Sequence, residues 1–318
     1  MWKILPENRL CIIYKLQHTM KLSQLCYTGL WFVRSRFFGR RNPLQTVLFI
    51  TNACNLGCKH CAIYEHQQPV MKSIDQIREE LQYSYNLGSR FVDFEGGEPT
   101  LWRQDGKTVD DLIDMALSMG FFSCTITTNA QRPFKGSHAN SIWVSLDGIG
   151  PVHDDIRGEG AFARLEKNIA ECGHPAVSVN MTINNRNYTN VEEAIRYVKN
   201  NPHIQMISFS FHTPYEGTEH LFLDWPVRAQ VIDKIIEMKK QGYPIMNSVS
   251  ALQLMKDNNF KKECWVSNFI LHDGTRFTEC TGKTAGVCDR CGFGMGAEMH
   301  SVFSFKWDTL KAGMSLRM

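Results

Sequence analysis

The stretch "TNACNLGCKHCAIY", residues 51–64, places three cysteines within eight residues. Cys54, Cys58 and Cys61 have the spacing C-x3-C-x2-C, and no fourth cysteine lies close to them in the sequence. Thiolates hold iron–sulfur clusters, and a four-iron cluster has four irons to ligate. Three cysteines leave one iron open, so the spacing predicts a site for chemistry rather than a closed structural metal site.

The composition of the chain predicts an intracellular protein with reduced thiols. The 318 residues include 11 cysteines, an odd number, and no secretory signal is recognisable at the N-terminus. Disulfides persist mainly in oxidising compartments, so we expect a cytoplasmic protein whose cysteines ligate metal or do chemistry. The longest apolar-leaning run near the N-terminus covers only residues 25–33, so we expect no transmembrane helix.

From residue 47 onward, short β-rich runs alternate with helical patterns, which is typical of βα units and a parallel sheet. The helical patterns carry start and stop signals, such as the capping-box pair Ser73 and Gln76 and the terminating Gly88. Six βα units predict a partial TIM-like (β/α)6 barrel, with ligands at the C-terminal ends of its strands. The predicted strands are residues 47–51, 91–95, 124–128, 141–146, 177–183 and 206–211.

A second motif, "EGGEPT" at residues 95–100, directly follows the second predicted strand. Gly96 and Gly97 would let the backbone approach a ligand closely. Glu98 adds a charge suited to an ammonium group. Because the cysteines follow the neighbouring strand, both motifs are predicted to form one site.

The cysteine loop and the GGEP turn, each after its predicted strand, resemble the radical S-adenosylmethionine (radical SAM) superfamily over residues 45–215. In this family an open iron of a [4Fe-4S] cluster binds the amino and carboxylate groups of SAM, and the reduced cluster cleaves SAM to methionine and a 5′-deoxyadenosyl radical. The resemblance implies that Cys54, Cys58 and Cys61 hold this cluster. It also implies a low-potential reductant such as flavodoxin or ferredoxin. His60 departs from the family, which usually has an aromatic or apolar residue there.

The resemblance implies further SAM contacts besides Gly96, Gly97 and Glu98. Ser145 in "VSLDG" matches a serine that contacts the ribose, and Arg157 in "HDDIRG" matches an arginine that pairs with the SAM carboxylate. Two further matches, Asn180 and Tyr64, occupy places that often border the ribose and adenine.

A second group of cysteines lies near the C-terminus, at Cys264, Cys280, Cys288 and Cys291. Four cysteines suffice for one closed iron–sulfur cluster and equally for a structural zinc ribbon. Together with Gly274 in "LHDGTRF", their pattern resembles the twitch and SPASM extensions, which hold auxiliary iron–sulfur clusters. This resemblance favours an auxiliary [4Fe-4S] cluster.

The N-terminal arm differs in charge from the rest of the chain. Residues 1–45 contain eight basic residues and one acidic residue, and they include an apolar row at helical spacing, namely Leu22, Cys26, Leu30, Val33 and Phe37. Such a helix could lie at an anionic membrane surface, at the inner face of the membrane, or pack beneath the barrel and close it. We expect no nucleic-acid partner.

We therefore expect three segments: the arm at residues 1–45, a radical SAM core at 46–222 and a C-terminal helix with a twitch-like module at 223–318. The stretches "CDRCGFGMGAE" and "NSVSALQLM" resemble radical SAM proteins of hopanoid biosynthesis, in which the adenosyl radical adds to a lipid alkene. This resemblance predicts a lipid or isoprenoid substrate. The alternatives are a peptide or protein maturase and, outside enzymes, an iron–sulfur electron carrier or redox sensor.

Overall fold

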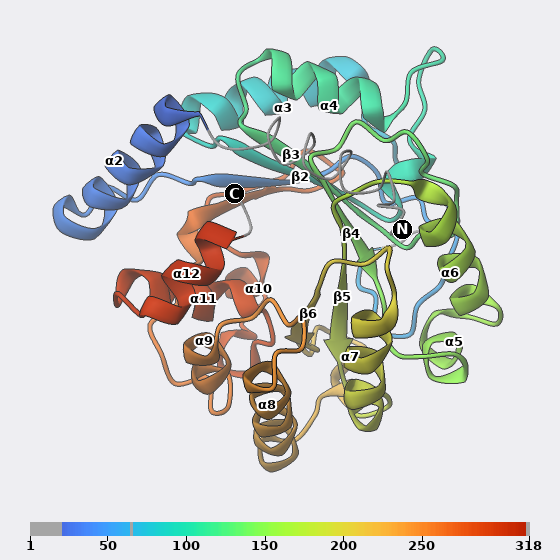
Figure 1. Ribbon diagram of the computed structural model, residues 1–318. Coiled ribbons are helices and arrows are strands. Elements are labelled where there is room, and N and C mark those ends of the chain that lie inside the picture. The colour runs from blue at the N-terminus through green and yellow to red at the C-terminus, as the bar shows by residue number, and fades with distance from the viewer. Residues whose placement is uncertain (1–20, 64–65, 316–318) are drawn as a thin grey trace, which may run out of the picture.

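A computed structural model describes residues 21–63 and 66–315 of the chain. Its centre is one eight-stranded sheet with the order β6-β5-β4-β3-β2-β1-β7-β8 (Figure 1). All neighbouring strands are parallel except β7 and β8. The predicted partial TIM-like (β/α)6 barrel is thereby confirmed for β1 to β6, and β7 and β8 of the C-terminal segment extend the same sheet beyond β1. The strands are β1 Gln45–Phe49, β2 Phe91–Glu95, β3 Ser123–Thr128, β4 Ser141–Ser145, β5 Val177–Ile183, β6 Ile207–Phe211, β7 Ser267–Ile270 and β8 Arg276–Phe277.

The bounds of β1 differ more from the predicted ones than those of any other predicted strand. It ends at Phe49, two residues before the predicted end, because Thr51 has already left the ladder. The Thr51 hydroxyl donates to the Val70 carbonyl at 2.7 Å and accepts from the Ala53 N–H at 2.9 Å. Thr51 therefore starts the cysteine loop rather than ending the strand.

Helices surround the curved sheet on its outer side (Figure 1). The predicted capping box is confirmed, since the Ser73 side chain accepts from the Gln76 N–H. The apolar core lies between the sheet and this ring, where Leu48, Phe94 and Leu112 have no exposed surface. The helices of the ring are α3 Ile74–Leu87, α4 Val109–Ser118, α5 Pro151–Arg157, α6 Ala161–Cys172, α7 Val191–Asn200 and α8 Trp225–Lys240.

The inner face of the sheet is largely polar along β2 to β6, whereas Val47 and Phe49 of β1 also have the inward register. Successive side chains of a strand point to opposite faces, so the residues between the core positions point into the barrel. Hydrogen bonds join some of them across strands, as between the Thr125 and Ser141 hydroxyls at 2.9 Å and from the Ser208 hydroxyl to Asn180 Oδ1 at 2.7 Å. Residues with this inward register are Asp93, Glu95, Thr125, Thr127, Ser141, Trp143, Ser145, Asn180, Thr182, Ser208 and Ser210.

The C-terminal segment fills the open side of the barrel, between β6 at one edge of the sheet and the pair β7 and β8 at the other (Figure 1). The Phe211 N–H donates to the Gly292 carbonyl at 2.8 Å, and the Gly292 N–H donates to Thr213 Oγ1 at 2.9 Å. The segment therefore attaches directly to the edge strand β6. Its helices are α9 Val249–Leu254, α10 Thr281–Thr284, α11 Gly294–Phe303 and α12 Trp307–Ser315.

Helix α2, Leu22–Phe38, lies at the amino ends of β1, β2 and β7. Its Trp31 packs in an apolar cluster with Leu44, Phe91 and Phe303. The Trp31 indole N–H donates to the Asn42 carbonyl at 2.8 Å. One side of α2 therefore packs beneath the barrel, which is one of the two arrangements expected for the arm. Among the described helices, none is both long and apolar enough to cross a bilayer.

The contact at Gly292 predicts how the C-terminal segment depends on the barrel. A Cβ atom there would lie 1.7 Å from the Phe211 carbonyl oxygen. We expect Gly292→Ala to destabilise the protein by about 2 kcal/mol or more, because backbone must shift to relieve the clash. The change would be measured as a lower Tm in thermal unfolding followed by circular dichroism.

Gly29 in α2 provides the matched control, since no atom lies within 4 Å of a Cβ built there. Gly29→Ala should leave the Tm unchanged or raise it slightly, because alanine favours helix. Equal melting temperatures for the two variants would contradict the proposed tight contact between Gly292 and β6.

Candidate functional site

The three cysteines of the first loop follow β1, and two of their sulfurs accept backbone N–H groups. Leu56 donates to Cys54 Sγ and Ile63 donates to Cys61 Sγ, both at 3.5 Å. Burial raises the pKa of Cys58 to about 11. Cysteine binds metal as the thiolate, and burial disfavours this charged form. Cys58 therefore needs a positively charged partner, such as bound iron, to stay deprotonated.

The glycine turn after β2 lies directly against the start of this loop. A Cβ atom would lie 2.3 Å from the Thr51 carbonyl oxygen at Gly96 and 2.2 Å from the Ala53 carbonyl oxygen at Gly97. The Gly97 N–H donates to the Thr51 carbonyl and the Glu98 N–H to the Ala53 carbonyl, each at 2.8 Å. Gly96 and Gly97 thus allow the close approach expected of two glycines. The group that they approach here is the backbone at the start of the cysteine loop.

Glu98 is fully buried and linked to the turn after β3. Its carboxylate accepts the Thr128 hydroxyl and the Asn129 N–H, both at 2.7 Å, and also accepts two donors from Thr100. Burial raises the pKa of Glu98, and these bonds act in the opposite direction. The Asn129 amide in turn donates to Cys54 Sγ at 3.6 Å. Both carboxylate oxygens of Glu98 thus already accept hydrogen bonds from the protein itself. That Glu98 binds a ligand ammonium group stays a prediction.

An ion pair between Arg157 and Asp147 lies beside the cysteines. Arg157 Nε donates to Asp147 Oδ2 at 2.6 Å, and Arg157 Nη1 donates to Cys58 Sγ at 3.8 Å. Burial alone would raise the pKa of Asp147, but Arg157 holds it below its usual value. His60 Nε2 lies 3.8 Å from the same carboxylate oxygen. The sequence analysis named Arg157 in "HDDIRG" as a site residue. It missed Asp147, although it named the neighbouring Ser145 in the same segment, "VSLDG".

Ser145 and Asn180 are brought together by the register of β4 and β5, in which they are directly opposite each other. Both are half-buried on the inner face of the barrel. Ser145 is the last residue of β4, and Asn180 lies in the middle of β5. Tyr64, the remaining predicted SAM contact, lies outside the described residues. The described members of the predicted SAM site therefore lie around the carboxyl ends of β1, β2 and β4, with Asn180 of β5 opposite Ser145.

Two acidic residues on the inner face of β2 were missed by sequence reasoning. Asp93 accepts the Thr127 hydroxyl at 3.1 Å. Burial and the neighbouring Glu95 raise the pKa of Asp93 well above its usual value, and burial raises the pKa of Glu95. The available signal was the alternation in "FVDFE", which places both carboxylates on the face opposite the core residues Val92 and Phe94.

The four C-terminal cysteines line one cavity of about 500 Å³. Burial, followed by the neighbouring thiols, raises the pKa of Cys264 to about 12. Backbone N–H groups donate to the sulfurs of Cys280 and Cys291, each at 3.4 Å. In residues 21–63 and 66–315, no three His, Cys, Asp or Glu side chains are arranged to hold a single metal ion.

A buried cation lies beside this cavity. The Arg228 guanidinium donates twice to the Cys291 carbonyl, at 3.1 and 3.2 Å, and lies over the rings of Phe211 and Trp225. Burial lowers the pKa of Arg228 to about 10. Its Nε atom has no hydrogen-bond partner among the described residues. This positive charge suits a negatively charged thiolate-bound cluster in the cavity.

Comparisons with known proteins agree with this geometry. The family model of the radical SAM superfamily matches residues 48–198. GTP 3′,8-cyclase of Mannheimia succiniciproducens is 33% identical over 174 residues, which cover 50% of each chain. Mycofactocin maturase MftC of Mycobacterium tuberculosis is 28% identical over 158 residues, 48% of this chain and 40% of MftC. The chain thus matches about half the length of these curated relatives or less.

Solved structures agree with the fold. SuiB of Streptococcus suis bound to S-adenosylmethionine has a TM-score of 0.60 and 16% identity, covering 76% of this chain and 61% of SuiB. SuiB bound to precursor peptide SuiA has a TM-score of 0.59 and 17% identity, covering 81% and 65%. At such identities the likeness shows the fold alone. The family match, however, includes the cysteine loop, the glycine turn and the pair Asp147 and Arg157. Residues 48–198 of the chain therefore match the radical SAM superfamily in sequence.

Proposed function

We propose that this chain is a radical SAM enzyme whose [4Fe-4S] cluster is held by Cys54, Cys58 and Cys61. The observation that carries the proposal is the attachment of the Gly96–Gly97 turn to the start of the cysteine loop, which brings the ends of β1 and β2 together at one site. Hydrogen bonds to the sulfurs also suit a thiolate-bound cluster, whose potential they help to set.

When bound and reduced, this cluster would supply the electron that cleaves SAM to methionine and a 5′-deoxyadenosyl radical. The protein's part is to orient SAM and exclude other reactants. Arg157 places a guanidinium next to Cys58, where its remaining N–H groups can hold the SAM carboxylate. Ser145 and Asn180 offer a hydroxyl and an amide to the ribose from neighbouring strands.

For the substrate we favour a peptide or protein over the lipid or isoprenoid expected from the sequence. Asp93 and Glu95 lie on the inner face of β2, and an apolar substrate would offer them no hydrogen bonds beyond those made within the protein, such as the one from Thr127 to Asp93. A peptide offers donors and acceptors along its whole backbone. The maturase MftC among the relatives supports the same interpretation.

For the C-terminal module we propose an auxiliary [4Fe-4S] cluster held by Cys264, Cys280, Cys288 and Cys291. Four thiolates around zinc form a tight tetrahedron with Zn–S bonds of about 2.3 Å. A lined cavity of about 500 Å³ is better suited to a cluster of several irons. We also propose that flavodoxin or ferredoxin supplies the electrons.

The enzyme proposal is tested by anaerobic incubation of reconstituted protein with SAM and dithionite, with mass spectrometry of 5′-deoxyadenosine. We expect release that Cys58→Ala abolishes and that the matched control Cys26→Ala leaves intact, because Cys26 lies exposed on α2. Protein with intact clusters but no release would favour the electron carrier.

The substrate class is tested in the same reaction by adding peptide or lipid fractions from the organism that encodes the chain. We expect the peptide fraction to stimulate 5′-deoxyadenosine release and to contain products of changed mass. Stimulation and modified products in the lipid fraction alone would restore the lipid interpretation.

Arg157→Gln should lower 5′-deoxyadenosine release about tenfold or more, because it removes charge-assisted hydrogen bonds and leaves the buried Asp147 unpaired. Arg157→Lys keeps the charge but loses the planar fork, so we expect partial activity. The control Arg186→Gln breaks an exposed pair with Asp155 and should have little effect. Activity of Arg157→Gln equal to that of the control would exclude a role in the site.

Cys280→Ala should reduce the iron content from about eight to about four atoms per chain, while SAM cleavage without added substrate persists. Iron and zinc are both measured by inductively coupled plasma mass spectrometry. About one zinc per chain in the unmodified protein, lost in Cys280→Ala, would instead establish the zinc ribbon.

A further inference from the structure

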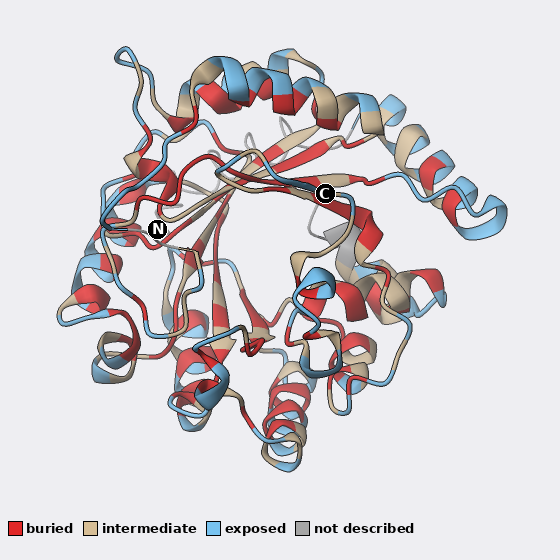
Figure 2. Ribbon diagram, turned by 180° about the vertical axis from the view of Figure 1, so that it is seen from behind, coloured by how far each residue is buried: buried red, intermediate tan, exposed pale blue. Residues whose placement is uncertain are grey.

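Helix α2 presents an apolar stripe that the described residues leave uncovered. The side of α2 that contains Trp31 and Ser35 is buried, while the opposite side is exposed (Figure 2). Single exposed apolar residues are common, but a contiguous row of them marks an interaction surface. We define the α2 outer face as Leu22 (77% exposed), Leu25 (51%), Leu30 (48%), Val33 (41%) and Phe37 (61%).

Aromatic residues extend the α2 outer face beyond the helix. Phe38, Phe305 and Trp307 are 72%, 51% and 72% exposed. The ring of Phe305 lies 6.4 Å from that of Phe37, between centroids. Phe305 has a φ of +55°, a conformation that non-glycine residues rarely adopt, at the junction of α11 and α12. Two segments far apart in the sequence thus place exposed aromatic rings next to one another.

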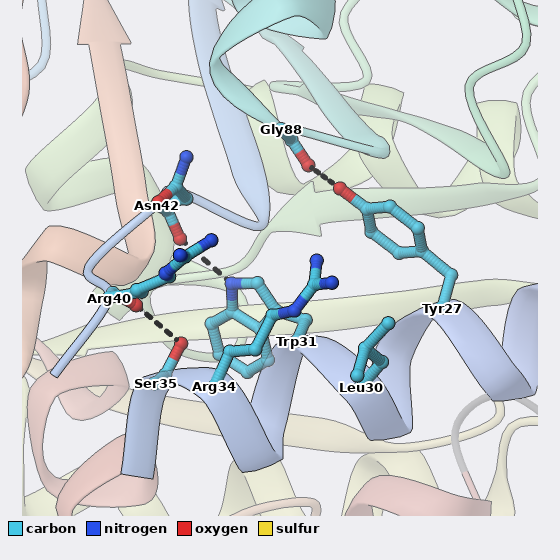
Figure 3. A pocket seen from close by; sticks show the side chains of 8 residues that line it. All are labelled: Tyr27, Leu30, Trp31, Arg34, Ser35, Arg40, Asn42 and Gly88. Carbon is cyan, nitrogen blue, oxygen red and sulfur yellow. Dashed lines mark hydrogen bonds between the residues drawn. The ribbon is translucent and has the colours of Figure 1, made fainter. Parts of the chain in front are cut away.

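The charge around the α2 outer face is entirely basic within the helix and its C-terminal turn, since residues 21–41 contain no Asp or Glu. Arg34 and Arg40 line a cavity of about 140 Å³ together with Leu30 and Trp31. Figure 3 shows both arginine side chains beside the Trp31 ring, and neither arginine forms an ion pair with another described residue. The apolar stripe therefore has Arg34 and Arg40 at its border, and a third cation, Arg36, lies over the rings of Phe37 and Phe305.

We propose that the α2 outer face docks onto an anionic membrane surface, with Arg34 and Arg40 binding a lipid phosphate. Leucine and aromatic side chains would enter the boundary between headgroups and acyl chains, as in other interfacial helices. A second copy of the chain is the less suitable occupant. A twofold contact through this face would bring the same arginines of both copies together, whereas anionic headgroups complement them.

This surface is distinct from the proposed site. α2 packs at the amino ends of β1, β2 and β7, whereas the cysteine loop and the glycine turn follow the carboxyl ends of β1 and β2. Docking would therefore localise the enzyme at a membrane and leave the opposite end of the barrel accessible. The proposal does not depend on a lipid substrate, and it stands or falls separately from SAM chemistry.

The test is cosedimentation of the full chain with sucrose-loaded vesicles of phosphatidylcholine alone or with phosphatidylglycerol added. We expect binding only to the anionic vesicles, weakening as salt is raised. Leu22→Gln with Leu25→Gln, and separately Arg34→Gln with Arg40→Gln, should each weaken binding about fivefold or more. Lys135→Gln with Lys167→Gln changes the net charge equally on another exposed part of the chain and should bind nearly as well as the unmodified protein.

Unchanged Tm and unchanged 5′-deoxyadenosine release in the α2 variants would show that their loss of binding comes from the surface itself. Three results would overturn the proposal. One is no preference for anionic vesicles at low salt, and another is equal binding by the α2 and lysine variants. The third is a concentration-dependent dimer, seen by light scattering, that Leu22→Gln with Leu25→Gln abolishes, since this would assign the face to a second copy.

Discussion

The backbone hydrogen bonds from Gly97 to Thr51 and from Glu98 to Ala53 join the turn after β2 to the loop after β1. They form only because Gly96 and Gly97 have no Cβ atoms, which would overlap the carbonyl oxygens of that loop. Most of the site depends on this contact. Glu98, placed by the turn, fixes Asn129 after β3, and Asn129 reaches the sulfur of Cys54.

The alternation of strands β2 to β6 gives the barrel an apolar outer layer and a largely polar interior. On β2, Val92 and Phe94 enter the core, while Asp93 and Glu95 face inward. Burial raises the pKa values of both carboxyl groups, because the charged form costs free energy there. Hydrogen bonds from a polar substrate or cofactor would offset this cost. The cysteine loop and glycine turn lie at the carboxyl ends of the strands and α2 lies at their amino ends, so the proposed active site and the proposed docking face are at opposite ends of the barrel.

The sequence predicted what local patterns determine. Strands β2 and β5 begin and end at the predicted residues, because alternating β-branched and aromatic residues bounded by turns define them. β1 was displaced by two residues, since the side-chain hydrogen bonds of Thr51 replace the ladder there. The pairing of β7 with β1 could not be predicted, because it joins residues more than 200 positions apart, as in Gln45 opposite Ser267.

The same limit applies to the site. The spacing of Cys54, Cys58 and Cys61 carries its own chemistry and was visible in sequence, whereas the support given by Asp147 and Asn129 depends on contacts between separate turns. The most direct test of an open cluster at this site is electron paramagnetic resonance of the reduced protein with and without SAM. The account predicts that SAM changes the cluster spectrum in the unmodified protein and in Cys280→Ala, and has no effect in Cys58→Ala. A spectrum that SAM leaves unchanged in protein with intact clusters would contradict it.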